Sequence, residues 1–379
     1  MERNHVNITM ILDLYNILIE KYGEQMKQTP QSPKFHGEGD VYTHTMMVCD
    51  ALKSLPEYIE LNETQQNILY IAALLHDIGK ISTTVFQDGD WHSPNHAIKG
   101  SKMARELMFK DFLIGGKKEL LEMRETICTL IRYHSFPTHA IENESTVKMH
   151  KIASNGLLMP DFSIKMLCIL SKADTLGRIC DDKEAVLEKI EMCKELAIED
   201  GCYESCYKFP SDRTRRLFLS GNEIWKDSEL YDDTWGTVYM MSGLPGVGKD
   251  HTIKQELGDI PMISLDEIRK EMNVSPTDNQ GAVASAAREM AKEYLRKHQS
   301  FVWNATNLTP QMREQLISLF ENYKANVHII YVESNYNKLQ SQNKQREDIV
   351  PQDVIDNMLA KLVVPMAFEA KNVTWMCNN

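Results

Sequence analysis

Two groups of residues in this chain have the types and spacing that phosphate chemistry requires. The first contains histidines and aspartates, among them the adjacent pair His76-Asp77, and such side chains bind divalent metals that activate water. The second is a glycine-rich run, Gly243-Leu-Pro-Gly-Val-Gly248-Lys249, whose backbone amides and lysine are suited to holding phosphate. The sequence therefore predicts one site that removes phosphate and another that adds it, a pairing that indicates end processing of nucleic acid.

Apolar helices are expected to position the first group. Asn62 is predicted to open a largely buried helix that ends in His76-Asp77, and Asp161 a second helix that brings Asp174 to its end. Polar side chains on a buried helix are costly to desolvate unless a charge holds them there. A bound cation meets that cost, so both helices are predicted to supply metal ligands.

Further histidines lie before and after that pair, near apparent helix ends. A lone histidine on an apolar face is usually a core residue, so the order of the residues carries the argument. The segment 35–178 resembles the HD phosphohydrolase superfamily, which is named for its adjacent His-Asp pair. The resemblance implies a mostly helical fold in which four residues bind a divalent metal: His44, His76, Asp77 and Asp174. In binuclear members two more histidines complete a second metal site, and the matching stretches here contain His96 and His134.

The ligand types narrow the choice of metal. Mixed imidazole and carboxylate ligation suits Mn, Fe, Ni, Co or Zn better than Ca. Bound water then becomes hydroxide near neutral pH and attacks a phosphorus atom held by the same metals. Asp77 is expected to bridge the metals and to help hold this nucleophile. Lys80 neutralises phosphate oxygens in one interpretation and is a surface lysine after a helix-ending glycine in the other.

The glycine-rich run follows a short apolar stretch of strand type, Thr237–Met241, and precedes a helix. In that context the amides and the helix N-terminus bind phosphate oxygens, and Lys249 reaches the terminal phosphates of ATP or another nucleoside triphosphate. The predicted nucleotide-binding residues are Gly243, Leu244, Pro245, Gly246, Val247, Gly248, Lys249 and Asp250. Asp250 replaces the usual Ser or Thr, and we expect it to contact magnesium directly or through water, with Thr252 a less favoured substitute.

Strand-like and helical stretches alternate after this loop. Strand-like runs at 260–263, 301–303 and 327–332 are separated by helical stretches such as 281–297 and 309–323. The alternation predicts an α/β domain, a parallel sheet covered by helices, with its chemistry at the carboxyl ends of the strands. Asp266 follows the second strand, whereas Asn304 ends the third, where motor ATPases place a carboxylate. This difference favours phosphate transfer to an organic hydroxyl over ATP hydrolysis for work.

The segment 237–365 resembles the 5'-hydroxyl polynucleotide kinases in its loop and in three further motifs, Ser264-Leu-Asp266-Glu-Ile-Arg269, Asn304-Ala-Thr306-Asn307-Leu and Asn343-Lys-Gln-Arg346. The resemblance implies that Asp266 is the general base for the 5'-hydroxyl and that Arg269 contacts the neighbouring phosphate of the acceptor. It also implies that Arg346 belongs to a lid over ATP and that Arg313 faces the phosphate donor or acceptor.

Three of these residues have a simpler interpretation. Asp266 is a candidate helix cap, Arg269 its solvent-exposed partner three residues on, and Arg346 a solvated residue in a charged stretch. Gln342 stands where phage-type kinases have an additional lid arginine, so phosphate clamping is expected to depend more heavily on Arg346.

Length and composition are those of a two-domain globular protein, with 379 residues, 42% of them hydrophobic and 25% charged. We expect a helical metal-dependent phosphohydrolase domain over 1–207, a linker over 208–234 and a kinase domain over 235–379. In the linker, the basic Arg213-Thr-Arg215-Arg216 run is interpreted as a solvated helix face in preference to a phosphodiester contact. The formal net charge of -12 argues against non-specific wrapping of duplex nucleic acid but leaves room for a local basic site.

The chain shows no targeting or membrane signal. Its first residues lack the unbroken apolar run of a signal peptide, and no stretch approaches the roughly 18 uncharged apolar residues of a transmembrane helix. A cytoplasmic protein with no membrane partner is therefore expected.

Nearly the whole chain resembles the bacterial fusions of an HD domain with a polynucleotide kinase. That resemblance implies RNA end healing: ATP- and magnesium-dependent phosphorylation of 5'-hydroxyl RNA or DNA ends, and removal of a 2'-phosphate or opening of a 2',3'-cyclic phosphate, after which an RNA ligase rejoins the strands. Two alternatives stay open. One is a nucleoside or small-metabolite kinase fused to an HD nucleotidase, and the other is a nucleotide-responsive regulator that binds ATP without transferring phosphate.

Overall fold

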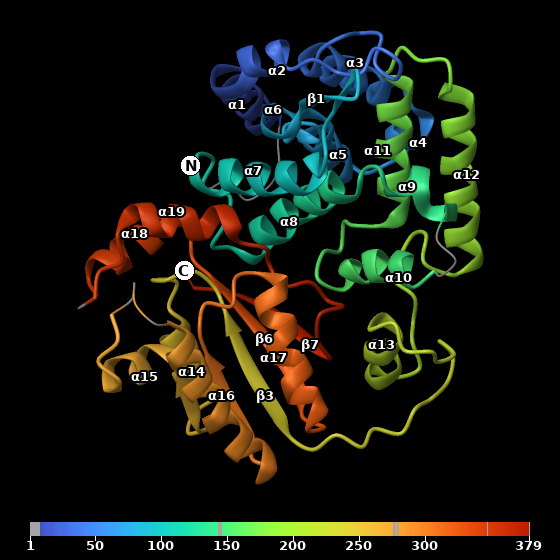
Figure 1. Ribbon diagram of the computed structural model, residues 1–379. Helices are drawn as coiled ribbons and strands as arrows, with labels where there is room; N and C mark the ends of the chain where they lie inside the picture. Colours follow the sequence, from blue (N-terminus) through green and yellow to red (C-terminus); the bar gives the residue numbers. More distant parts are fainter. Residues whose placement is uncertain (1–7, 143–145, 276–277, 279, 347, 379) are drawn as a thin grey trace. The chain divides into compact units, whose positions relative to one another are not determined.

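The computed structural model describes residues 8–142, 146–275, 278, 280–346 and 348–378 (Figure 1). The chain divides into two compact units, the first formed by residues 1–114 and 119–208 and the second by residues 115–118 and 209–379. The first unit is helical and the second is built on a parallel sheet, which confirms the predicted fold class of each half. Among the described residues, no helix is both long and apolar enough to span a bilayer.

Helices make up nearly all of the regular structure before residue 208. They are α1 (Ile8–Leu18), α2 (Glu24–Gln28), α3 (Val41–Ser54), α4 (Pro56–Ile59), α5 (Glu63–Leu75), α6 (Lys80–Thr83), α7 (His96–Lys110), α8 (Lys118–Tyr133), α9 (Phe136–His139), α10 (Val147–Ala153), α11 (Ile164–Leu176) and α12 (Lys183–Glu199). A π-helical turn at Ile19–Gly23 joins α1 to α2, and 3-10 turns lie at Ala140–Glu142 and Ser154–Leu157. Two short antiparallel strands, β1 (Val85–Gln87) and β2 (Asp90–His92), form a hairpin between α6 and α7.

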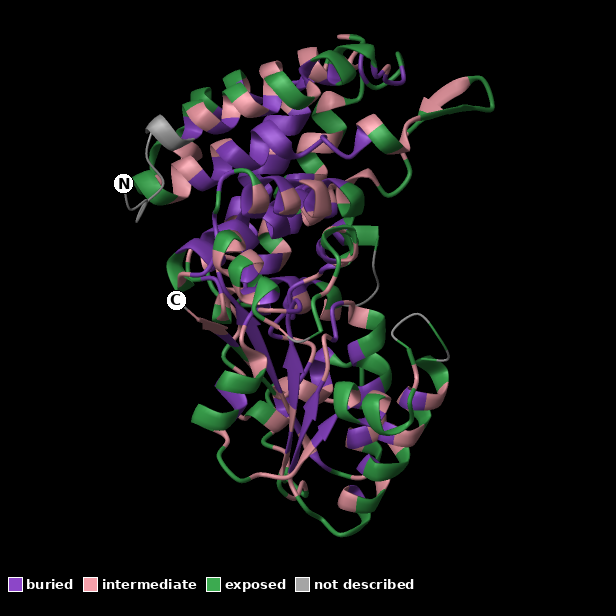
Figure 2. Ribbon diagram, turned by 90° about the vertical axis from the view of Figure 1, so that its left-hand side faces the viewer, coloured by how far each residue is buried: buried purple, intermediate pink, exposed green. Residues whose placement is uncertain are grey.

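The centre of this unit is formed by α3, α5 and α11, which pack against one another. Val48, Ile68 and Leu167 have no exposed surface, and α5 is buried over most of its length after its first turn (Figure 2). A helix that is apolar on most sides must be enclosed by others, so the sequence of α5 already specifies its central place. The ends of these enclosed helices carry the predicted metal ligands.

The two predicted helix caps have different outcomes. Asn62 caps α5 as predicted, because its side-chain oxygen accepts a hydrogen bond from the amide of Gln65 at 2.9 Å. The prediction for Asp161 is wrong, since α11 is capped by Ser163, whose hydroxyl accepts from the amide of Met166 at 3.3 Å. Ser163 has the extended backbone that a capping residue needs directly before the first helical residue, whereas Asp161 lies in the preceding turn.

The second unit contains a five-stranded sheet in the order β4-β5-β3-β6-β7, with all neighbouring strands parallel. The strands are β3 (Thr237–Ser242), β4 (Met262–Ser264), β5 (Phe301–Asn304), β6 (Asn326–Glu333) and β7 (Asn372–Cys377). The four strands predicted from apolar runs are all present, with bounds shifted by one or two residues. β3 occupies the middle of the sheet, so the loop that follows it emerges at the centre of the carboxyl edge.

Helices cover this sheet, and most of the strand residues are buried (Figure 2). The helices of this unit are α13 (Asp212–Leu219), α14 (Lys249–Glu256), α15 (Leu265–Glu271), α16 (Gln280–Arg296), α17 (Pro310–Asn322), α18 (Tyr336–Lys344) and α19 (Gln352–Lys361). Sequence reasoning missed β7, which is an edge strand. Its exposed positions carry Asn372 and Thr374, so it lacks the continuous apolar run that identified the inner strands.

The segment predicted as a linker is largely attached to the second unit. Its helix α13 places Arg216 in a double contact with the Glu321 carboxylate, at 2.7 and 2.9 Å, and Arg215 donates to the carbonyl of Lys371 at 2.7 Å. Arg213 lies 3.2 Å from Asp233. The expectation that these arginines form a solvated face is therefore wrong, because intramolecular acceptors hold them against the sheet domain.

Candidate active sites

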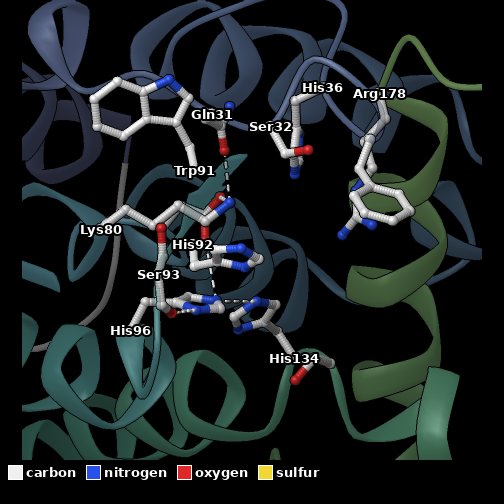
Figure 3. A pocket seen from close by; sticks show the side chains of 13 residues that line it. Gln31, Ser32, His36, Lys80, Trp91, His92, Ser93, His96, His134 and Arg178 are labelled. Carbon is white, nitrogen blue, oxygen red and sulfur yellow. Dashed lines mark hydrogen bonds and ion pairs between the residues drawn. The ribbon is translucent and has the colours of Figure 1, made fainter. Parts of the chain in front are cut away.

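Three of the predicted metal ligands of the first unit, Asp77, His96 and His134, line a pocket of about 270 Å³. Its lining includes Asp77, Lys80, His96, His134 and Arg178 (Figure 3). Each of these residues stands at or just beyond a helix end: after α5, at the start of α6 and α7, and after α8 and α11. The predicted placement of the ligands at helix ends is thus confirmed, and the helix ends are what bring distant parts of the sequence together.

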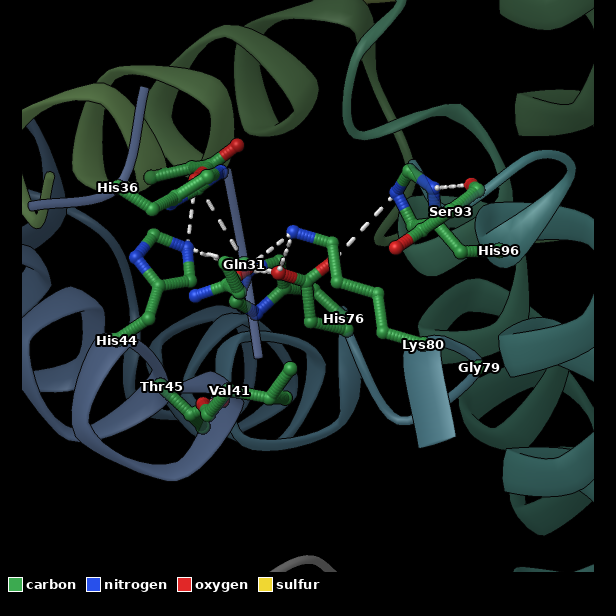
Figure 4. Close-up of polar contacts among 12 residues, drawn as sticks. Gln31, His36, Val41, His44, Thr45, His76, Gly79, Lys80, Ser93 and His96 are labelled. Atoms are coloured by element: carbon green, nitrogen blue, oxygen red, sulfur yellow. Dashed lines mark hydrogen bonds and ion pairs between the residues drawn. The ribbon is translucent and has the colours of Figure 1, made fainter. Parts of the chain in front are cut away.

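Four imidazoles approach one another in pairs through their Nε2 atoms, and Figure 4 shows three of them, His44, His76 and His96. The Nε2 atoms of His44 and His76 are 3.4 Å apart, and so are those of His96 and His134. The other nitrogen, Nδ1, lies 2.7–2.9 Å from the carbonyl oxygen three residues earlier in His76, His96 and His134. A ring whose Nδ1 carries the donated proton offers a lone pair on Nε2, which is the arrangement found in metal-ligating histidines.

Asp77 stands between the two histidine pairs. Its Oδ2 lies 3.3 Å from Nε2 of His76, and its Oδ1 lies 3.4 Å from Nε2 of His96. The ligand atoms therefore form two overlapping groups, His44 with His76 and Asp77, and Asp77 with His96 and His134, each within 4.8 Å. A carboxylate shared by two such groups is suited to bridging two metal ions.

Asp174 completes the first group. Its Oδ1 lies 3.1 Å from Nε2 of His44, and its Oδ2 accepts from Arg178 at 2.5 Å. Lys80 similarly contacts Asp77 at 2.8 Å and donates to Oε1 of Gln31 at 2.6 Å. Lys80 is buried, with 8% of its surface exposed, so the alternative that it is a surface lysine is wrong. Each ligand carboxylate thus has one cationic side chain beside it.

Two glycines allow the helix ends to approach closely enough for this geometry. A Cβ at Gly79 would lie 2.0 Å from the carbonyl oxygen of His96 and 2.6 Å from the amide of Gly100. A Cβ at Gly177 would lie 2.7 Å from the backbone nitrogen of Val48. Gly79 therefore permits the contact between the HD turn and α7, and Gly177 the contact between the end of α11 and α3.

The electrostatics favour neutral histidines on one side of the pocket. Burial lowers the pKa of His134 to about 3, and His76 and His96 act in the same direction. Burial also lowers the pKa of His96. For Asp77, burial by itself raises the pKa, but Lys80 and His76 outweigh it and hold the pKa well below its ordinary value. Near neutral pH these residues are thus two neutral imidazoles and an ionised carboxylate, the forms that bind a metal.

Sequence reasoning missed a second layer around His44. Glu38 lies 2.9 Å from Nδ1 of His44 and 2.8 Å from Nδ1 of His36, and it accepts the backbone amide of Ile179 at 2.9 Å. A carboxylate behind a ligating imidazole fixes the ring's tautomer and orientation. Arg178 and Gln31 were also missed, because a side chain that acts through another ligand has no fixed spacing in the sequence.

The donor set fits a binuclear transition-metal site. All four histidines converge through Nε2, and Oδ1 of Asp77 is buried without a hydrogen-bond partner, which is costly unless a cation accepts its lone pairs. Three carboxylates, Glu38, Asp77 and Asp174, also outnumber the two cations Lys80 and Arg178. The residues that would hold the metals are His44, His76, Asp77 and Asp174 for one ion and Asp77, His96 and His134 for the other.

The glycine-rich loop of the second unit links the end of β3 to the start of α14. Gly243, Gly246 and Gly248 have φ values of 146°, 80° and 88°, a region that residues with a side chain rarely adopt. A Cβ at Gly243 would also lie 2.4 Å from the carbonyl oxygen of Val332. The glycine spacing noted in the sequence is therefore required by backbone conformation as well as by access to phosphate.

Lys249 lies within this loop and is half-buried. Its ammonium group donates to the carbonyl oxygens of Gly243 and Leu244 at 3.1 and 3.0 Å. Burial lowers the pKa of Lys249 to about 8, although Asp250 acts against this. Asp250 is exposed, and its Oδ1 accepts from Nδ2 of Asn304 at 2.7 Å. Asn304 ends β5, so the residue that replaces a strand-end carboxylate here orients the carboxylate of the loop.

Asp266 stands on the same carboxyl edge of the sheet, in the first turn of α15. Ser264 caps that helix, accepting from the amide of Glu267 at 3.3 Å, so the alternative that Asp266 is the cap is wrong. The Asp266 carboxylate is 67% exposed and contacts Arg269 at 2.5 Å. Nη2 of Arg346 lies 3.9 Å from it. The structure thus brings Asp266, Arg269 and Arg346 together, although the Asp266–Arg269 pair is also the contact that the simpler interpretation predicted.

Arg313 does not face this site, which corrects the prediction. Its side chain is fully buried and makes a double contact with Glu369, at 2.6 and 2.8 Å. It also donates to the carbonyl oxygens of Asn307 and Val363 at 2.9 and 3.0 Å. A guanidinium with all of these acceptors serves to hold the chain segments around it and has no free face for phosphate.

Asn378 was missed although it touches the phosphate loop. Its Nδ2 donates to the carbonyl oxygen of Val247 at 2.9 Å and lies 3.2 Å from the hydroxyl of Thr252. The residue follows β7, whose position was not visible in the sequence, so no local signal could have identified it. Thr252 itself donates to the carbonyl of Gly248 at 3.2 Å, which favours Asp250 over Thr252 as the metal contact.

Comparison with known protein families gives two matches that do not overlap. The HD domain model matches residues 41–176, which include all six predicted metal ligands. The AAA domain model matches residues 238–365, from β3 past the Arg346 loop and through α19. The chain is therefore a fusion of an HD phosphohydrolase-type domain with a P-loop kinase-like domain of the AAA type.

Proposed function

We propose that this chain is a bifunctional nucleic-acid end-healing enzyme that acts on broken RNA. Its P-loop domain phosphorylates 5'-hydroxyl ends, and its HD domain removes a 2'-phosphate or opens a 2',3'-cyclic phosphate. The observation that carries the proposal is that one chain contains both a His/Asp cluster and a phosphate loop whose Lys249 is within electrostatic reach of Asp266. The products are the ends that an RNA ligase joins, so a ligase is the expected partner in the pathway.

In the kinase domain, the loop amides and Lys249 would hold the triphosphate, and Asp250 would contact its magnesium. Asp266 is exposed toward solvent and close to two arginines, so an incoming hydroxyl can reach its carboxylate. Asp266 would accept the proton of the 5'-hydroxyl as the oxygen attacks the γ-phosphorus in line with the leaving ADP. Arg346 would stabilise charge on the transferred group, and Arg269 would position Asp266 and the acceptor.

In the HD domain, a bound divalent metal supplies activation of water and polarisation of a phosphoryl oxygen. The chain's own residues determine where the ester lies. Lys80 and Arg178 are the cations of the pocket lining, so they would hold the non-bridging oxygens of the phosphate. Asp77 would orient the attacking water through the oxygen that lacks a protein partner. The departing oxygen is that of the ribose.

The kinase assignment is tested by incubating the protein with γ-labelled ATP, magnesium and a 5'-hydroxyl RNA. We expect label at the RNA 5' end, and we expect Asp266→Asn to lower the transfer rate by about 10²–10⁴-fold while ATP binding is kept. Asp259→Asn, at an exposed position of the same domain, is the matched control. Efficient labelling of free nucleosides with no labelling of RNA would replace this proposal with a small-molecule kinase.

The hydrolase assignment is tested with RNA that ends in a 2',3'-cyclic phosphate or a 2'-phosphate, in the presence of Mn, Ni or Co. We expect metal-dependent hydrolysis by the parent protein and by Asp266→Asn, whose substitution lies in the other domain. Failure on both termini, by a protein that retains its metal, would contradict the proposed substrate.

A further inference from the structure

We propose that the HD pocket binds its phosphoester as part of a nucleotide whose base stacks on Trp91. This inference rests on the proposed function of the HD domain and deepens it, because it names the group that is recognised beside the phosphate. Trp91 lines the same pocket as Asp77, Lys80 and His96 (Figure 3). It comes from the β1–β2 hairpin, which supplies none of the metal ligands.

The hairpin presents aromatic side chains outside the hydrophobic core. Phe86 is directly opposite Trp91 in the strand register, and their ring centroids are 5.0 Å apart at 62°. Phe86 is 61% exposed and Val85 is 45% exposed, while Trp91 is half-buried. Leaving this much apolar surface in water is unfavourable, and Phe86 meets the indole edge-on without stacking on it. Because Trp91 also lines the pocket, we assign its pocket-lining surface to a flat ligand group.

Residues before and after Trp91 in the sequence make hydrogen bonds that hold the hairpin in place. Asp90 accepts a hydrogen bond from the hydroxyl of Ser32 at 2.6 Å and from the amide of Trp91 at 2.8 Å. Ser93 bonds Thr84 at 2.8 Å through their hydroxyls. A two-stranded hairpin is only marginally stable alone, so these contacts fix Trp91 at the pocket instead of leaving it on a free loop.

The remaining lining matches the other parts of a nucleotide. Lys80 and Arg178 provide positive charge for a phosphate, and Ser32 provides a hydroxyl suited to a ribose. Phe35, 39% exposed, is a second aromatic side chain of the lining. Stacking on an aromatic ring is tolerant of base identity because every base has a flat face. The pocket is therefore expected to select nucleotides over other phosphoesters without selecting one base.

The test compares a ribonucleoside 2',3'-cyclic monophosphate with ribose 2',3'-cyclic phosphate that lacks a base. We expect Trp91→Ala to raise KM for the nucleotide by about tenfold or more, with kcat and metal content little changed. Trp91→Ala should raise KM for the abasic substrate far less, and in Trp91→Phe the KM for the nucleotide should return close to that of the parent. Trp225→Ala, at a 69% exposed tryptophan of the second unit, is the matched control. Equal losses for the two substrates would overturn the stacking proposal.

A binding measurement separates this inference from the hydrolase assignment because it needs no turnover. A non-hydrolysable analogue of a nucleoside 2'-monophosphate, titrated into the metal-loaded protein, should quench tryptophan fluorescence in the parent and in Trp225→Phe, and much less in Trp91→Phe. If quenching depends on Trp91 but no RNA terminus is hydrolysed, the nucleotide-binding site is supported and the proposed reaction is contradicted. Quenching that is the same in Trp91→Phe and the parent would remove the stacking site whether or not hydrolysis occurs.

Discussion

The two sites of this chain are assembled in opposite ways. The phosphate loop is a continuous run from Gly243 to Asp250, and its form follows from local backbone conformation. The HD cluster draws on residues from His36 to Arg178 and forms only when several helix ends meet. A local site depends on φ values and on a few side chains, whereas a convergent site depends on the packing of its whole unit. Substitutions should therefore impair the phosphate loop through local backbone strain or loss of a side chain, and the HD cluster through changes in helix packing.

The largest expected effect is the loss of one activity with the other retained. Asp77→Ala removes the carboxylate shared by both ligand groups, so metal content and phosphoester hydrolysis should fall to background. Lys249→Ala should lower phosphate transfer by about 10²–10³-fold and leave hydrolysis intact. Metal analysis and both activity assays on each variant check this, with Asp50→Ala, exposed on α3, as control. Loss of both activities in a folded Asp77→Ala protein would show that the two units are coupled.

The next effect concerns the buried ion pairs that hold each unit. Glu125 is buried between Arg105 and Arg124, at 2.7 and 2.9 Å. It therefore ties α7, which begins at His96, to α8, which ends just before His134. Removing one partner of a buried pair leaves an uncompensated charge, so Glu125→Gln should cost about 3–5 kcal/mol of unfolding free energy. Chemical unfolding measures this cost.

The corresponding pair in the second unit is Arg313 with Glu369. Glu369→Gln should destabilise that unit by a similar amount while leaving the rate of phosphate transfer by folded protein unchanged. A specific loss of transfer without loss of stability would return Arg313 to the active site. The pair of variants thus compares the two units directly and tests the structural role of Arg313.

A smaller effect is expected from replacing glycines, and it distinguishes a glycine required by close packing from one required by its backbone conformation. Gly79 has φ of -66°, which any residue adopts, but a Cβ there meets the His96 carbonyl at 2.0 Å. Gly79→Ala should cost about 1–3 kcal/mol by overpacking and should weaken metal binding because it displaces α7. Gly246 has φ of 80° and a nearest Cβ contact of 3.2 Å, so Gly246→Ala should cost about 1–2 kcal/mol through strain and should weaken nucleotide binding. Thermal unfolding, together with metal and nucleotide titrations, distinguishes the two variants. If Gly79→Ala weakened metal binding and nucleotide binding equally, the predicted difference between the two sites would be contradicted.

The same contrast explains what the sequence could predict. The loop, its strand and the positions of Asp266 and Asn304 were found because the signals are local and end at recognisable turns. The six candidate metal ligands were chosen because their order resembles a known family, although their spacing alone would not have joined them. Glu38, Arg178 and Trp91 were missed because they act through tertiary contacts, and Asn378 because its strand is a polar edge. Arg313 was misplaced because its acceptor, Glu369, is far along the chain.

The smallest predicted effect is a change in the protonation of Lys249 when nucleotide binds to the phosphate loop. Burial lowers the pKa of Lys249 to about 8, so the unfolded chain binds this proton more strongly, and the lysine's contribution to stability rises as pH increases from about 8 toward its ordinary value. Triphosphate favours the charged ammonium and should raise that pKa again. Nucleotide binding above about pH 8 should therefore take up a proton, and affinity should fall with rising pH there.

Calorimetric titration of a non-hydrolysable nucleotide in two buffers of different ionisation enthalpy measures the proton uptake directly. At about pH 9 we expect up to about one proton per nucleotide for the parent, and much less at about pH 7. Lys249→Arg keeps its charge throughout this range, so it should bind without the lysine-dependent uptake, and Lys249→Ala should bind weakly without it. If proton uptake persists unchanged in Lys249→Arg, the proton belongs to another group, either in the loop or on the nucleotide's own phosphate. Because the HD cluster lies in the other unit, Asp77→Ala should leave this proton count unaltered, which makes it the control that ties the effect to the local site.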